Sequence, residues 1–270
     1  ATSAAELVGI MAGTRWLWRD WIPRGYLSAL VGDKGRGKSA LALWLAAAAT
    51  GQVSWPNGEW VDEPQQVLWI DTEGRQGVLI ERIVHWGLDA NRIHLPGRHG
   101  MDVPRLDAAE GIAEIAALVR SLRPGLVVID SVSGGHGMDE NSSAIRTILK
   151  GLAEEVARPY DAAVLLVHHL GKPQAAPGSP RRRIEATMAD ARGSNAFQQL
   201  VVSGIVLDRP DFESEVQRLR VDEANLCTPP DPIGFTLDEH GIPLFVEAPQ
   251  PERALTATEK ARTFLREYLS

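Results

Sequence analysis

The sequence is short of three things: cysteine, long apolar runs and an excess of positive charge. Its single cysteine, Cys227, excludes an internal disulfide and a cysteine-rich zinc site within these 270 residues. We therefore expect a reducing compartment, the cytoplasm, with Cys227 as a packed or surface residue rather than a nucleophile. The alanine-rich run Ala40–Ala49 falls short of the roughly 18 apolar residues that a membrane-spanning helix needs, so we expect no membrane partner.

The charge balance argues against a protein whose whole surface grips nucleic acid. Lysine and arginine number 28 against 35 acidic residues, a formal net charge of −7. The concentrated positive charge is the run Arg181, Arg182 and Arg183, inside the proline- and glycine-containing stretch Gly171–Ala189. Two interpretations stay open for this flexible basic loop. It is either a solubilising surface loop or a contact to the phosphate backbone of single-stranded nucleic acid.

The apolar pattern predicts one large α/β domain. Continuous apolar stretches at Gln66–Asp71, Leu126–Asp130 and Ala162–Val167 suit strands that are buried on both faces of a parallel sheet, and helical patterns separate them. The alternating pieces at Val216–Val221 and Leu244–Val246 indicate antiparallel additions. The expected fold is a mainly parallel sheet flanked by helices, with antiparallel strands added at one edge.

A complete phosphate-loop motif, G-x-x-x-x-G-K-S, lies between the apolar run Tyr26–Val31 and the helical stretch Ala40–Ala49. Glycines allow successive backbone N–H groups to point at phosphate oxygens, and the following helix adds its positive N-terminal end. We expect Lys38 to reach the β- and γ-phosphates of ATP and the Ser39 hydroxyl to ligate Mg²⁺. The predicted nucleotide-binding residues are Gly32, Asp33, Lys34, Gly35, Arg36, Gly37, Lys38, Ser39 and Ala40.

Acidic residues follow two of the predicted strands. The stretch L-V-V-I-D ends in Asp130, about 90 residues after the phosphate loop, which is the Walker B pattern and predicts a second Mg²⁺-holding residue. Glu73 follows Asp71 by two residues and would lie near the γ-phosphate. A carboxylate there suits the activation of the attacking water. On spacing alone, a solvated turn acid is the favoured interpretation of Glu73.

Two histidines, His168 and His169, end the strand that we expect beside Walker B. A histidine pair without a nearby third ligand is a weak metal signal. A hydrogen bond from one of them to the γ-phosphate is the more attractive interpretation.

The two ends of the chain differ from its centre. Residues 1–25 carry Trp16, Trp18 and Trp21 and are read as a lead-in hairpin or edge segment packing over the nucleotide end of the sheet. Core packing of these tryptophans is favoured over a base-stacking platform for nucleic acid. Residues 248–270 are read as a linker and an amphipathic helix opened by a Thr256–Glu259 capping box, and the absence of a polar finish suggests the start of a truncated C-terminal region.

The ordered set of motifs resembles the RecA-like ATPases, and most closely the RepA-type hexameric replicative helicases of plasmids, phages and mobile elements. The resemblance covers about residues 22–221. It rests on G-D-K-G-R-G-K-S, W-I-D-T-E-G-R, L-V-V-I-D-S, a D-E-N before a helix, L-L-V-H-H-L-G-K, and D-A-R-G-S-N-A-F followed by L-D-R. It implies a RecA-like ATPase domain over residues 26–247.

The resemblance assigns roles to single residues. It implies that Glu73 is the catalytic base, reversing the interpretation from spacing, and that His169 is the γ-phosphate sensor. By its position after the D-A-R-G-S segment, Arg209 would be an arginine finger that enters the neighbouring subunit's site, or else a plain strand-end charge, with Arg192 as the second candidate. The segments Ser133–Asn141 and Lys172–Ala189 would face a central channel.

Three functions are open at this stage. The first is a ring-forming, hexameric ATPase that moves along single-stranded DNA as a replicative helicase. The second is a recombinase-like filament ATPase, which would pair strands. The third is a regulatory nucleotide-binding switch whose ATP state changes its affinity for a partner or a DNA site.

Overall fold

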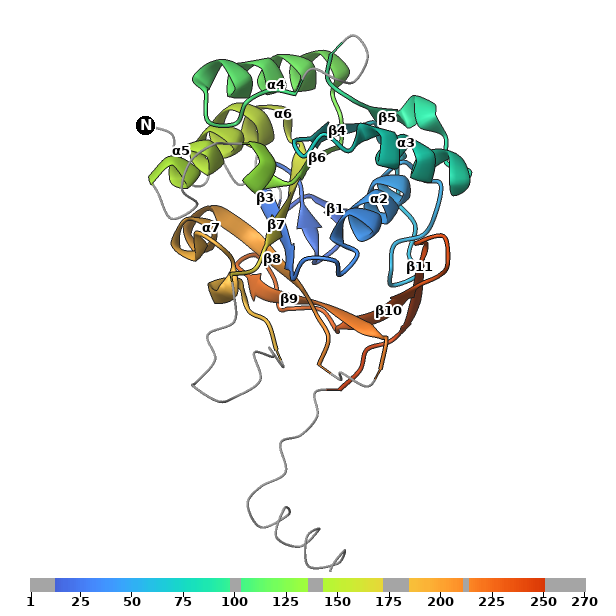
Figure 1. Cartoon of the computed structure of the whole chain (residues 1–270). Coiled ribbons are helices and arrows are strands. Elements are labelled where there is room, and N and C mark those ends of the chain that lie inside the picture. Colours follow the sequence, from blue (N-terminus) through green and yellow to red (C-terminus); the bar gives the residue numbers. More distant parts are fainter. Residues whose placement is uncertain (1–12, 98–102, 136–142, 172–184, 211–213, 251–270) are drawn as a thin grey trace, which may run out of the picture.

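A computed structural model describes residues 13–97, 103–135, 143–171, 185–210 and 214–250 (Figure 1). A nine-stranded sheet forms its centre, in the order β11-β10-β9-β8-β3-β7-β6-β4-β5. The strands from β8 to β5 run parallel, whereas β8, β9, β10 and β11 form an antiparallel meander. The strands are β3 (Leu27–Gly32), β4 (Val67–Asp71), β5 (Ile93–His94), β6 (Leu126–Asp130), β7 (Ala163–His169), β8 (Val201–Asp208), β9 (Gln217–Ala224), β10 (Ile233–Leu237) and β11 (Pro243–Glu247).

Helices cover both faces of the sheet (Figure 1). Alternate residues of each central strand point to opposite faces, so that one face packs against α2 and α3 and the other against α4, α5 and α7. Short 3-10 turns lie at Ala90–Arg92, Val132–Gly135 and Met188–Asp190. The helices are α2 (Lys38–Ala49), α3 (Gln76–His85), α4 (Ala109–Leu122), α5 (Ser143–Gly151), a π-helical stretch (Leu152–Ala157), α6 (Arg158–Tyr160) and α7 (Ser194–Leu200).

The expected fold class is confirmed, and the differences are local. The helix predicted to run to Arg158 is wound as a π-helix over Leu152–Ala157 before α6 completes it. The strand predicted over Ala162–Val167 extends through both histidines, because His168 and His169 keep pairing with Val31 and Gly32 of β3. The predicted placement of that strand beside Walker B is confirmed, since β7 pairs with β6.

The lead-in segment forms a small antiparallel pair, β1 (Trp16–Trp18) and β2 (Ile22–Pro23). Two of its three tryptophans are core residues as expected, since Trp18 and Trp21 are stacked 4.4 Å apart and almost fully buried, whereas Trp16 is only partly buried. The predicted position over the nucleotide end is wrong. Ser203, near the start of β8, donates a 2.6 Å hydrogen bond to the Trp21 carbonyl, and Trp18 stacks on Trp55 beyond the C-terminal end of α2. The indoles therefore pack at the end of the sheet that lies opposite the phosphate loop.

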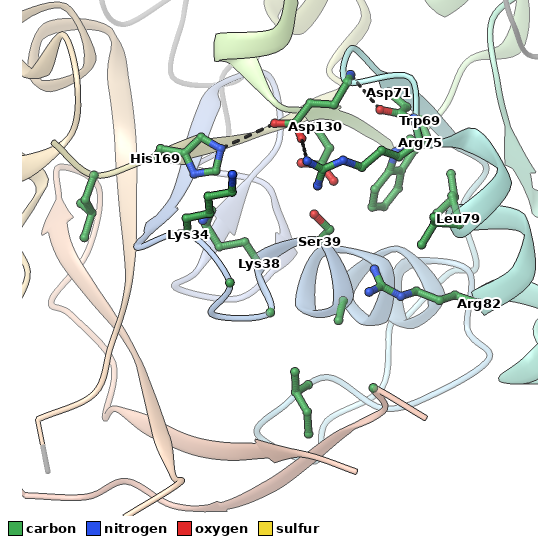
Figure 2. A pocket seen from close by; sticks show the side chains of 18 of the residues that line it. Lys34, Lys38, Ser39, Trp69, Asp71, Arg75, Leu79, Arg82, Asp130 and His169 are labelled. Carbon is green, nitrogen blue, oxygen red and sulfur yellow. Dashed lines mark hydrogen bonds and ion pairs between the residues drawn. The ribbon is translucent and has the colours of Figure 1, made fainter. Parts of the chain in front are cut away.

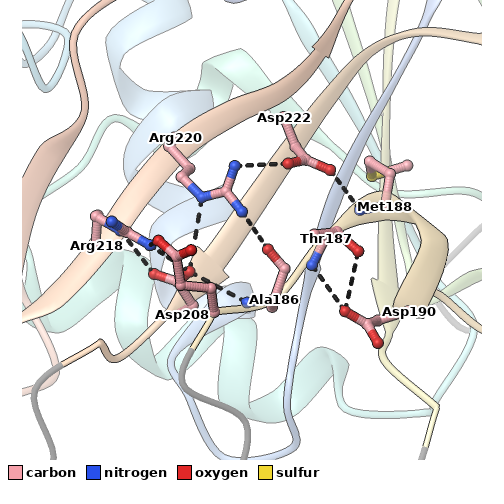
Figure 3. A network of polar contacts seen from close by, with 9 residues as sticks. Ala186, Thr187, Met188, Asp190, Asp208, Arg218, Arg220 and Asp222 are labelled. Atoms are coloured by element: carbon pink, nitrogen blue, oxygen red, sulfur yellow. Dashed lines mark hydrogen bonds and ion pairs between the residues drawn. The ribbon is translucent and has the colours of Figure 1, made fainter. Parts of the chain in front are cut away.

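Buried ion pairs fasten the segment that precedes α7 to the antiparallel meander (Figure 3). The Arg218 guanidinium donates to both oxygens of Asp208, at 3.0 Å from Nε and 2.8 Å from Nη2. Its Nη2 also donates to Glu185 at 2.9 Å. The Ala186 backbone N–H donates to Asp208 at 3.3 Å. The end of β8 and the residues before α7 are thus held as one unit.

Within the described residues, no helix has the length and apolarity to cross a membrane. The predicted boundary between the central domain and the C-terminal region falls where β11 ends, at Glu247. The predicted amphipathic helix lies outside the described residues, as does the basic run Arg181–Arg183.

Candidate nucleotide-binding site

A cavity of about 530 Å³ opens where β4, β6 and β7 end and α2 begins (Figure 2). Its floor is the phosphate loop, and α3 and the β10–β11 hairpin form its other walls. Such a position, at the carboxyl ends of parallel strands, is where open α/β sheets bind ligands. Lining residues are Lys34, Gly35, Gly37, Lys38, Ser39, Ala40, Trp69, Asp71, Glu73, Arg75, Val78, Leu79, Arg82, Asp130, His169, Leu170, Arg192, Leu237 and Gly241.

The phosphate loop has the backbone shape that its glycines predict. Gly35 and Gly37 both have φ of +78°, a region that residues with a Cβ rarely adopt. Gly37 is also confined from outside, because a Cβ there would lie 2.8 Å from Cδ1 of Leu237 in β10. α2 begins directly after it, at Lys38. Gly32, Asp33 and Arg36 shape the loop but do not line the cavity.

Lys38 lies buried at the base of the loop. Its Nζ donates hydrogen bonds of 2.9 Å to the carbonyl oxygens of Gly32 and Asp33. Burial lowers the pKa of Lys38 to about 8, although the nearby carboxylates of Asp130, Asp33 and Glu73 oppose the shift. A bound triphosphate would supply further negative charge beside this ammonium group and favour its charged form.

Asp130 and Ser39 fit the requirements of a magnesium ion. The Ser39 hydroxyl lies close enough to the Asp130 carboxylate to oppose the rise in its pKa, and carboxylate and hydroxyl oxygens are the ligands that Mg²⁺ prefers. Burial raises the pKa of Asp130 to about 6, and the negative charges of Glu73 and Asp71 add to the shift. A cation would relieve this accumulation of negative charge. No cluster of three or more histidine, cysteine or acidic side chains stands ready for a metal among the described residues.

Glu73 is not a solvated turn acid, since its side chain is only 20% exposed and lines the cavity. Ser131 Oγ donates a 2.7 Å hydrogen bond to its Oε1, and Arg75 Nη2 lies 2.7 Å from its Oε2. Partial burial favours a raised pKa, but Ser131, Arg75 and His169 together hold the pKa of Glu73 below its usual value. The group is therefore ionised at neutral pH, as a general base must be.

The two histidines of β7 face different partners. His169 Nε2 lies 3.6 Å from Glu73 Oε1, and its Nδ1 is buried without a hydrogen-bond partner among the described residues. Burial, with Lys38 and Arg192 nearby, lowers the pKa of His169, so the ring is neutral at pH 7. His168 is fully buried and contacts Ser133 Oγ at 3.2 Å through Nδ1 and the Arg192 carbonyl at 2.9 Å through Nε2.

The two predicted finger arginines lie in different places. Arg192 lines the cavity of its own chain. Arg209 follows β8 and does not line that cavity, and its Nε donates a 2.6 Å hydrogen bond to the Ser214 carbonyl. The structure thus brings together Lys38, Ser39, Glu73, Asp130 and His169 and keeps Arg209 apart from them.

Several residues in or beside the cavity were not predicted as site residues. Arg75 and Ser131 follow predicted strand-end acids. The contact of Ser131 with Glu73 depends on the pairing of β4 with β6, whereas Arg75 reaches Glu73 within one turn, two residues away. Leu237 approaches the phosphate loop across about 200 residues of sequence. Val78 and Arg82 lie on a helix whose periodicity predicts buried positions, but not which exposed positions border a ligand.

Comparison with known proteins gives the same fold. Similar solved structures include the crystal structure of the RadB recombinase (TM-score 0.55, 18% identity, covering 82% of this chain and 90% of that one). They also include the crystal structure of the KaiC-like protein PH0186 from Pyrococcus horikoshii OT3 (TM-score 0.58, 16% identity, covering 84% and 91%). No curated protein sequence matches the chain. A family model described as an AAA domain matches residues 2–175, more than half of the chain. The chain therefore belongs to this AAA domain family, and its fold is that of a RecA-like P-loop ATPase.

Proposed function

We propose that the protein is a ring-forming motor that hydrolyses ATP with Mg²⁺ and moves along single-stranded DNA, as a replicative helicase does. Two neighbouring side chains of β7 carry this proposal. His169 approaches the carboxylate of Glu73 at 3.6 Å, and His168 contacts Ser133 at 3.2 Å. Ser133 begins one of the two segments that the resemblance predicts to face a central channel, and β7 leads directly into the other. A change in the position of the Glu73 carboxylate can therefore be transmitted to both segments through β7.

In the proposed reaction the chain positions the triphosphate and the attacking water. The N–H groups of the phosphate loop and the start of α2 bind the phosphates, and Lys38 pairs with their charge. Mg²⁺, held by Ser39 and Asp130, would offset the charge of the β- and γ-phosphates. Glu73 orients the water and accepts its proton, while the neutral His169 ring senses the γ-phosphate through a hydrogen bond.

The proposed assembly is a hexamer in which one subunit completes its neighbour's site. Arg209 does not line the cavity of its own chain. Released from the Ser214 carbonyl, its guanidinium would stabilise the charge that develops on the neighbour's γ-phosphate.

A recombinase-like filament ATPase is the second candidate, favoured by the similarity in fold to the RadB recombinase. It would share the ATP site and the subunit-completed geometry. Fold alone does not separate the two, since one core powers different machines.

The deciding experiment measures steady-state ATP hydrolysis with and without single-stranded DNA, for the wild type and for Lys38→Ala and Arg209→Ala. We expect stimulation by DNA that either substitution abolishes, followed by unwinding of a forked duplex. Strand pairing without unwinding would favour the recombinase-like function. Slow hydrolysis indifferent to DNA and to Arg209→Ala would contradict both and leave a regulatory switch.

A further inference from the structure

We propose that Arg75 is a brake on the catalytic base: its guanidinium holds the Glu73 carboxylate in a resting position, and full hydrolysis requires that it let go. The inference rests on the proposed role of Glu73. It assigns to Arg75, the last residue of the W-I-D-T-E-G-R stretch, the control of DNA-free hydrolysis.

Both oxygens of the proposed base are occupied. Ser131 Oγ donates to Oε1 at 2.7 Å, and Arg75 Nη2 pairs with Oε2 at 2.7 Å. A carboxylate activates water only through an oxygen that is within hydrogen-bond reach of that water. Oε1 is held by Ser131 and approached by His169 at 3.6 Å, so Oε2 is the oxygen that departure of Arg75 would open to the water.

The backbone around Arg75 sets up this contact. Asp71, at the end of β4, accepts hydrogen bonds from the N–H of Glu73 at 2.9 Å and from the N–H of Arg75 at 2.5 Å. The turn therefore presents the two side chains beside one another. Figure 2 shows Arg75 and His169 reaching from opposite sides into the space above Lys38 and Ser39.

Of the two groups that hold Glu73, Arg75 is the one that can leave. Its side chain is 61% exposed, whereas Ser131 is buried between β6 and the following turn. Arg75 is the residue before α3 and its side chain makes no capping hydrogen bond to that helix. Its long side chain can therefore swing into solvent without breaking a cap of α3.

The release of Arg75 has a chemical consequence. A charge-assisted hydrogen bond stabilises the carboxylate and makes it a weaker proton acceptor. Loss of the pair frees Oε2 and strengthens the base at the same time. A stimulus that draws the guanidinium away, such as an acidic group of a neighbouring subunit, would therefore raise the rate of hydrolysis without altering nucleotide binding.

The test compares Arg75→Gln and Arg75→Lys with the wild type in steady-state ATP hydrolysis, with and without single-stranded DNA. For Arg75→Gln we expect the DNA-free kcat to rise about 3- to 10-fold, with an unchanged KM for ATP and a correspondingly smaller stimulation by DNA. Arg75→Lys keeps the charge but loses the planar fork, so its rate should lie between the two. The matched control is Arg105→Gln, which removes another exposed arginine paired with an acid two residues away, Asp107 at 2.9 Å.

Two results would overturn the brake. A raised KM with a lower kcat would make Arg75 a ligand of the phosphates, and kinetics like those of Arg105→Gln would make the pair incidental. Glu73→Gln, measured in parallel, separates this failure from failure of the proposed base. If ATP hydrolysis survives Glu73→Gln, Glu73 is not the base. If Glu73→Gln abolishes hydrolysis but Arg75→Gln leaves the DNA-free rate unchanged, only the brake is rejected.

Discussion

Lys38 lies in a site where burial destabilises the charged form of its amino group. Its pKa of about 8 lies below the ordinary value of 10.5. Between about pH 8 and pH 10.5, Lys38 is therefore protonated in the unfolded chain and deprotonated in the nucleotide-free folded protein. Between those two values, stability from this group rises with pH. The cost of the buried ammonium is thus greatest at neutral pH and below, where a triphosphate would offset it.

The corresponding prediction compares the wild type with Lys38→Met without nucleotide. As the pH rises from about 7.5 to about 10, the free energy of unfolding of the wild type should gain about 2–3 kcal/mol relative to the variant. Urea unfolding at a series of pH values measures the difference. A difference that stays flat over this range would show that the ammonium group is not desolvated.

At the scale of elements, the end of β8 depends on the buried pair of Asp208 and Arg218 (Figure 3). Asp208→Asn would leave the guanidinium with Glu185, whose side chain is half exposed, as its remaining carboxylate partner. We expect a loss of about 2–4 kcal/mol in the free energy of unfolding, because the charge of Arg218 stays buried. Denaturant unfolding is the measurement.

The control for this prediction is Glu154→Gln, which removes an exposed pair with Lys150 at 4.0 Å. It should cost less than about 0.5 kcal/mol. Equal losses for the two substitutions would mean that the Asp208 pair contributes no more than a surface contact. A smaller loss in the double variant Asp208→Asn/Arg218→Met than in Asp208→Asn alone would confirm that the unpaired charge is the cause.

The sequence predicted what depends on local pattern. The phosphate loop, the apolar strands and the acids that end them are each encoded within about ten residues, and all lie where expected. Contacts that require strand order escaped prediction. Ser131 meets Glu73 because β4 lies beside β6, and Leu237 meets Gly37 because the meander folds back over α2. Trp18 and Trp21 of the lead-in segment were predicted correctly as core residues, but the end of the sheet on which they pack was not, because an apolar pattern carries no information on direction.

At the scale of the whole molecule, the proposed ring divides each active site between two subunits. Co-expressed Lys38→Ala and Arg209→Ala subunits should therefore restore activity that neither variant has alone. A Lys38→Ala neighbour still supplies Arg209 to an Arg209→Ala subunit whose own phosphate loop is intact. In an equal random mixture, roughly a quarter of the sites would be complete. ATP hydrolysis by the purified mixed assembly measures this, and activity no greater than the sum of the two variants would exclude a finger acting between subunits.

The three stacked indoles at the far end of the sheet give this molecule an optical signature. Trp18 lies 4.4 Å from Trp21 and 5.4 Å from Trp55, with planes within 5° of parallel. Indoles held this close couple their electronic excitations, so the circular dichroism of the folded protein carries a contribution that depends on their contact. Since Trp55 belongs to the connection after α2 and the other two tryptophans lie in or beside the β1–β2 pair, that contribution reports whether β1 and β2 are seated on the domain. Light can thus follow the docking of this segment without a label.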